Sequence, residues 1–242
     1  MNIGLSGDRA TINQLTGSLS SGGSIAVTGS IGITPGSGFP ADIAIRLNDG
    51  RYSDGRLVTA NLSGNLAVKG PLLSGLVLSG NIDLARTVVT IPERLPGSLS
   101  EIDVKHKNAP AAVQKQAAEL RPASSGGGGG SGGMQLDLTV NAPQQIFVQG
   151  RGIDVELGGS IRLQGAASAP EAVGQFTLRR GRLSIIGRRL DFTEGTLTFS
   201  GSLVPMLDLK ATSTVEGGTV SIVVTGPATN PEFAFESVPA LP

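Results

Sequence analysis

The sequence holds few side chains with obvious chemical reactivity, and their spacing limits what they could do. His106 is the only histidine, and it lies between Lys105 and Lys107 in a polar run. The chain contains no cysteine, which excludes thiol nucleophiles, disulfides and thiolate metal sites. No serine and aspartate can be placed around His106 with the spacing of a known nucleophile and base. We therefore interpret His106 as a solvated residue and not as a catalytic base.

A group of arginines forms the densest charge in the chain, and it allows two interpretations. A guanidinium can bind a phosphate through two hydrogen bonds, so contact with lipid phosphates is one. The other, which we favour, is a solvated outer face on which arginines alternate with carboxylates. Asp191 and Glu194 lie nearby on a predicted turn, and no partner for acid–base or metal chemistry is apparent. The arginines are Arg179, Arg180, Arg182, Arg188 and Arg189.

The glycine-rich segment Ser124–Gly133 could be mistaken for a phosphate-binding loop. Such a loop is followed by Gly-Lys-Ser or Gly-Lys-Thr and a helix, and neither follows here, so we predict a flexible linker. Lys plus Arg and Asp plus Glu both number 19, and a balanced charge argues against a nucleic-acid partner. We therefore predict that the protein is not an enzyme, binds no metal or cofactor, and does not bind nucleic acid.

The elements that carry the arginines have the pattern of β-strands. Across Gln175–Gly201 apolar residues recur at every second position, and side chains on a strand alternate between its two faces. We predict four short strands there, separated by turns at Gly181, Gly187 and Gly195. Nothing in this pattern is catalytic, and the stretch is predicted to build a surface.

The same alternation runs through most of the chain and predicts an all-β fold. Gly numbers 36 and aromatic residues make up 3%, and we count roughly sixteen strand candidates between turn signals such as Asn48-Asp49-Gly50. A sheet of that many strands would extend about 65–75 Å. Residues 1–97 and 134–242 are predicted to be two β segments of one continuous sheet. Residues 98–133 are predicted to be a helix-plus-linker, with a short helix near 109–120.

Two pairs of segments repeat at a nearly constant offset. Gly64–Gly70 matches Gly159–Gly165, an offset of 159 − 64 = 95, and Gly80–Arg86 matches Gly174–Arg180, an offset of 174 − 80 = 94. Repetition of a Gly-initiated strand and its return strand predicts an elongated sheet of stacked, similar units.

The composition also bears on what covers the apolar face of such a sheet. A sandwich or barrel core usually draws on large aromatic residues, whereas this chain has Trp 0, Tyr 1 and Phe 7. An aliphatic face with few large residues favours an open trough. A packed sandwich or barrel core is the alternative.

Several motifs, taken together and in order, resemble the C-terminal domain of the TamB family, within the AsmA-like superfamily. Each motif is loose alone, but their order and spacing are specific and cover most of the chain. The motifs are Ile91–Pro96, Val140–Pro143, Ile146–Asp154, Leu178–Arg182, Gly187–Phe192, Gly195–Gly201 and Gly226–Pro231.

The resemblance implies a location and two competing functions. TamB-like proteins span the periplasm of diderm bacteria, with an N-terminal helix in the inner membrane and a C-terminal region that docks an outer-membrane barrel of the Omp85 family (TamA-like). Their long sheet curls into a half-pipe with an apolar lumen, and they are similar to bridge-like proteins that carry phospholipid between membranes. The alternative is a scaffold that assists assembly of outer-membrane proteins, autotransporters included, by strand pairing. This chain lacks the anchor helix and stops at Ser237–Pro242, where the family continues, so it resembles an excised C-terminal fragment.

We therefore predict an elongated, curled, antiparallel-rich sheet that forms a half-pipe, with phospholipid as the ligand of its apolar lumen. At any single position the alternative is an ordinary packed core residue. The predicted lining residues are Leu66, Val68, Ile82, Leu84, Ile161, Leu163, Phe176, Leu178, Leu183, Ile185, Leu197, Phe199, Leu207, Leu209, Val220, Ile222 and Val224.

Overall fold

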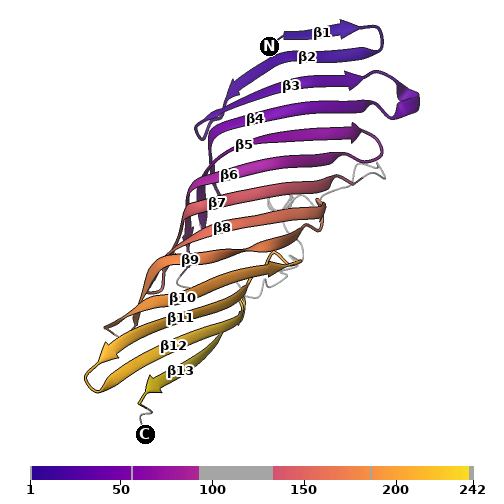
Figure 1. Cartoon of the computed structure of the whole chain (residues 1–242). Helices are drawn as coiled ribbons and strands as arrows, with labels where there is room; N and C mark the ends of the chain where they lie inside the picture. Colours follow the sequence, from indigo (N-terminus) through magenta and orange to yellow (C-terminus); the bar gives the residue numbers. More distant parts are fainter. Residues whose placement is uncertain (1, 56, 93–132, 186, 240–242) are drawn as a thin grey trace, which may run out of the picture.

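The computed structural model describes residues 2–55, 57–92, 133–185 and 187–239, and within them the fold is all-β (Figure 1). Its one short helix is a 3₁₀ turn, η1 (Pro35–Ser37), and no described helix has the length and apolar character needed to cross a membrane. The strands are β1 (Asn2–Ser6), β2 (Arg9–Ser18), β3 (Ser24–Gly32), β4 (Pro40–Ser53), β5 (Val58–Pro71), β6 (Val77–Thr90), β7 (Gln135–Gly150), β8 (Ile153–Ala166), β9 (Glu171–Ile185), β10 (Arg188–Ser200), β11 (Met206–Val215), β12 (Gly218–Pro227) and β13 (Glu232–Val238).

These described strands form a single 13-stranded sheet in sequence order, with β1 and β13 at its two ends (Figure 1). Every neighbouring pair is antiparallel except β6 and β7, which are parallel. Twelve intervals between strands, at about 4.8 Å each, give a sheet roughly 58 Å long. This is shorter than the sequence predicts, because some predicted pairs of strands are single long strands.

A line of β-bulges crosses the sheet and bends its strands. The register shifts within β2, β4, β6, β7, β9 and β10, each time near the middle of the strand. In β9, Leu178 pairs with Leu157 and Arg180 with Glu156, so Arg179 is an extra residue. A bulge bends its strand and increases the local twist. Repeated at neighbouring positions, the bulges curl the sheet into an open half-pipe, as the sequence predicts.

One face of the sheet is apolar and lies inside the curl; we call it the inner face. Leu157 is only 2% exposed, yet all described strands belong to this one sheet. Because no second described sheet covers it, such burial requires that inner-face side chains pack against one another across a concave surface. The described core cluster consists of Ala142, Ile146, Val155, Leu157, Phe176, Leu190, Phe192, Ala211, Ile222 and Val224.

Three predicted turns are wrong. Gly181 and Gly195 lie inside β9 and β10, so the stretch forms two long strands and not four short ones. A side chain at Gly195 would come within 2.8 Å of Leu209 Cδ2 and 2.9 Å of Leu178 Cβ; glycine is there because the inner face is crowded. Asn48-Asp49-Gly50 lies within β4, where Asp49 has a φ of 47° at a bulge. The predicted helix near 109–120 and the glycine-rich linker lie outside the described residues.

The sequence repeat corresponds to two equivalent hairpins. In β5 and β6, Leu66 pairs with Gly80, and in β8 and β9, Ile161 pairs with Gly174. Gly80 and Gly174 have φ angles of 136° and 133°, which side chains rarely tolerate. The repeat therefore marks positions where the same backbone geometry recurs. β6 and β7, which lie on either side of residues 98–133, are hydrogen-bonded neighbours in the one sheet.

Candidate functional site

The inner face gathers all of the predicted lining residues. Residues opposite one another in a ladder share a face, and the register joins Phe199 to Gly174, Gly174 to Ile161 and Ile161 to Val140. The same tracing places the predicted residues of β5, β6, β11 and β12 on this face. The bulges are essential to this result. Phe192 has an even residue number and Leu197 an odd one, so a regular strand would place them on opposite faces. The bulge at Thr193 brings both to the inner face.

Burial is uneven along the trough. Every large apolar side chain that is buried in the described residues lies in β7 to β12, and in β1 to β6 the buried apolar residues are Ala41 and Ala60. Among the predicted lining residues, Phe176, Ile222 and Val224 are buried in the core cluster. Ile185 is exposed, and the others are half-buried. Inner-face side chains are therefore packed more closely along β7 to β12 than along β1 to β6.

Charge is almost absent from the inner face. In the described strands, the register assigns every Asp, Glu, Lys and Arg to the outer face or to a bulge, with one exception. That exception is Arg188, the first residue of β10, which pairs with Ile185 and precedes the buried Leu190 by two positions. An apolar surface of this length, bounded by charge only at its margin, can accept hydrocarbon and excludes ions.

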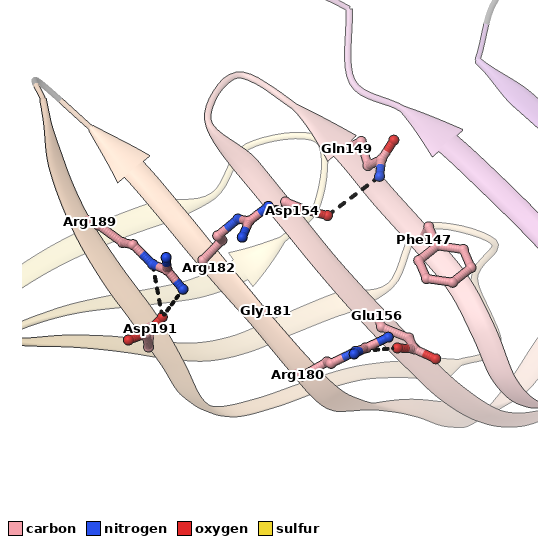
Figure 2. Close-up of a pocket in the computed structure, with 9 residues that line it drawn as sticks. All are labelled: Phe147, Gln149, Asp154, Glu156, Arg180, Gly181, Arg182, Arg189 and Asp191. Atoms are coloured by element: carbon pink, nitrogen blue, oxygen red, sulfur yellow. Dashed lines mark hydrogen bonds and ion pairs between the residues drawn. The ribbon is translucent and has the colours of Figure 1, made fainter.

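Three other arginines of the cluster, Arg180, Arg182 and Arg189, lie on the outer face and pair with carboxylates (Figure 2). Arg180 Nε lies 2.6 Å from Glu156 Oε2, and Arg182 Nη2 lies 2.8 Å from Asp154 Oδ2. Arg189 Nη2 lies 3.4 Å from Asp191 Oδ1. The favoured interpretation of a solvated face with interleaved charges holds for these three residues. Arg179 instead donates a hydrogen bond to the carbonyl oxygen of Pro143, at 3.4 Å.

These ion pairs border an outer-face cavity of about 400 Å³. Figure 2 shows Phe147 at one side of it and Arg189 at the other, with the ion-paired side chains between them. Phe147 belongs to β7, and its ring lies 5.7 Å from the Arg86 guanidinium carbon. Two of the pairs connect β8 and β9 at register positions, Glu156 with Arg180 and Asp154 with Arg182. Arg189 and Asp191 both belong to β10. The arrangement is that of a cross-strand charge ladder, which fixes strand register.

Some inner-face residues were missed by sequence reasoning. Ile25, Val27, Ile43 and Ile45 lie on the inner face in β3 and β4, although their alternation in the sequence is as regular as that of the predicted residues. Thr87 is a polar exception at the floor of the trough, 5% exposed and between Ala60 and Ile146 in the ladder. Its hydroxyl has no hydrogen-bond partner among the described residues.

Few features of the described residues indicate a metal site or a catalytic site. No group of three or more metal-ligating side chains occurs in the described part of the chain, and His106 lies outside it.

The family model described as the TamB C-terminal domain matches residues 13–242. No curated protein matches the chain.

Proposed function

The chain belongs to the TamB family, as a copy of its C-terminal domain, and from this premise we propose that it is a section of a periplasmic lipid conduit. In this proposal phospholipid acyl chains lie in the trough and pass along it between the inner and outer membranes. The observation that carries the proposal is the continuous, almost charge-free inner face, which runs through all of the described strands without a second described sheet over it.

The energetics favour such a ligand. Removing hydrocarbon from water is worth about 0.8 kcal/mol per methylene, so an acyl chain is held in an apolar trough at no cost in lost hydration. The outer face carries the ion pairs and stays in water. Headgroups would remain at the open side or the margin of the half-pipe, since the apolar interior of the inner face could not replace their hydration.

The test is the lipid content of the purified chain, compared between two neighbouring substitutions. Leu163→Arg places a charge on the inner face of β8, and Gln164→Arg places the same charge on the outer face one residue later. Mass spectrometry of extracted lipid should find phospholipid with the native chain and with Gln164→Arg, and severalfold less with Leu163→Arg. Equal lipid in both folded variants, or none in the native chain, would contradict the proposal.

Strand pairing is a second candidate function, and the end of the sheet favours it. β13 pairs with β12 on one side only within the described residues. Phe233, Phe235 and Val238 on β13 are 61%, 72% and 73% exposed. An unpaired edge of this kind can accept another strand, such as one from a nascent outer-membrane protein or from an Omp85-family barrel. Protein that carries no lipid but captures barrel-strand peptides, and loses this ability in Phe235→Lys, would support it.

A further inference from the structure

Arg188 differs from every other charged residue in the described strands because it starts a strand on the inner-face register. It is exposed, pairs with Ile185 across the β9–β10 hairpin, and stands two residues before Leu190. Leu190 is 4% exposed and belongs to the core cluster. A single strand therefore leads directly from a cation at the margin of the trough to its buried apolar floor.

The margin around Arg188 is hollowed. A cavity of about 640 Å³ lies between the start of β10 and the β11–β12 connection, and its lining includes Arg188, Arg189, Ser213 and Glu216. Arg189 already holds Asp191 at 3.4 Å, whereas Arg188 makes no ion pair with any residue that the structure describes. Among the described residues, Glu216 is the one carboxylate that lines the cavity. The cavity lining is mostly polar, with Val215 as its large apolar residue, and the apolar neighbours of Arg188 are Ile185 across the hairpin and Leu190 along β10.

We propose that Arg188 binds the phosphate of an amphiphile whose acyl chain lies on the inner face of β9 to β11. The proposal rests on the proposed lipid function and adds a defined headgroup site to it. A guanidinium binds phosphate through paired, charge-assisted hydrogen bonds. At the margin the phosphate keeps its remaining contacts with water, while the attached chain follows β10 from Arg188 past Leu190 to Phe192. The ligand class is an anionic phospholipid with a sterically accessible phosphate.

The experiment measures binding to the full chain, stripped of lipid, by calorimetry below the micellar concentration of each probe. The probes are dihexanoyl phosphatidic acid, dihexanoylglycerol and glycerol 3-phosphate, which carry both ligand parts, the chains alone and the phosphate alone. Arg188→Gln is compared with Arg182→Gln, which removes an outer-face arginine of β9 that does not line this cavity. Arg188→Gln should weaken phosphatidic acid binding about tenfold or more and leave dihexanoylglycerol binding unchanged. Arg182→Gln should change the binding of neither lipid.

The outcomes separate this inference from the function on which it rests. The headgroup site is wrong if Arg188→Gln binds phosphatidic acid as well as the native chain does. It is also wrong if this variant loses affinity for both lipids equally. In either case, lipid binding by the native chain still supports the trough. If glycerol 3-phosphate binds as tightly as phosphatidic acid, the cavity is a site for free phosphate and the inference is also wrong. If the native chain binds neither lipid, the proposed function itself fails.

Discussion

The rings of Phe176 and Phe199 meet edge to face on the inner face, with centroids 5.9 Å apart and planes at 88°. Phe176 lies in β9 and Phe199 in β10, two ladder positions apart, because Phe176 pairs with Leu197 and Phe199 with Gly174. Aromatic pairs prefer this geometry. The two rings have different environments: Phe176 is buried in the core cluster, and Phe199 is half-buried against it.

This pair allows a direct test of how firmly the trough wall is packed. Phe176→Ala should lower the free energy of unfolding by about 3–5 kcal/mol, as for other buried Phe residues, and Phe199→Ala should lower it by less. The double substitution should reveal a coupling of about 0.5–1.5 kcal/mol. Urea unfolding of the four proteins provides the values, and equal losses for the two single variants would contradict the burial described here.

The outer-face ion pairs should contribute unequally. The Glu156 side chain is 12% exposed beside Arg180, whereas Asp42 and Lys69 are 66% and 62% exposed. Glu156→Gln should therefore cost about 1 kcal/mol or more, because a neutral amide oxygen accepts from Arg180 more weakly than the partly desolvated carboxylate does. Asp42→Asn should change stability by less than about 0.5 kcal/mol. A stability series in low and high salt measures both, and a larger loss for Asp42→Asn would reverse the ranking.

The repeated glycine should be intolerant of any side chain. Gly174 has a φ of 133°, and a Cβ there would lie 2.9 Å from Ile161 Cα in the neighbouring strand. Gly174→Ala should destabilise the fold by at least about 1–3 kcal/mol, the range for a strained backbone conformation. Gly36→Ala is the control, since no atom lies within 4 Å of its added Cβ. Thermal unfolding that ranks the two variants equally would show that the repeat has another cause.

Removal of the Thr87 hydroxyl should stabilise the fold. It is 5% exposed on the trough floor, and no described residue hydrogen-bonds its Oγ1. Valine has the same shape without the polar atom, so Thr87→Val should raise the free energy of unfolding by about 1 kcal/mol or more, the cost of burying an unpaired polar group. Thr59→Val is a useful comparison, because Thr59 Oγ1 lies 3.4 Å from Ser53 Oγ and its loss should not be stabilising. A destabilised Thr87→Val would mean that the hydroxyl is satisfied.

The sequence predicts the apolar face well and the strand boundaries less well, for one physical reason. A turn and a bulge both reverse the phase of apolar alternation, and the sequence alone does not separate them. At Gly195 the change of phase was interpreted as a turn, but the pairing of Phe192 with Ala211 and Glu194 with Lys210 shows a bulge within one strand. The decisive information lies in the partner strand, which has no extra residue.

The arginine cluster shows that the alternation of residues within a strand could have improved the prediction of which arginine lies on the inner face. Arg188 lies two and four positions before Leu190 and Phe192 and therefore on the same face of β10, whereas Arg189 lies on the opposite face. The gradient of burial along the trough, by contrast, depends on how the bulges curve the whole sheet. No local pattern encodes that curvature, so the sequence could not distinguish the buried Phe176 from the half-buried Leu66.

The most direct test of a lipid-lined trough is site-by-site photo-crosslinking to phospholipid, for which the absence of native cysteine allows single labelled positions. Labels would be placed along β10 at Asp191, Phe192, Leu197 and Thr198. Lipid adducts should form at Phe192 and Leu197 and not at Asp191 or Thr198. The reactive positions should therefore change from even to odd residue numbers across the bulge at Thr193. Adducts on both faces alike, or on neither, would contradict a trough whose inner face holds lipid.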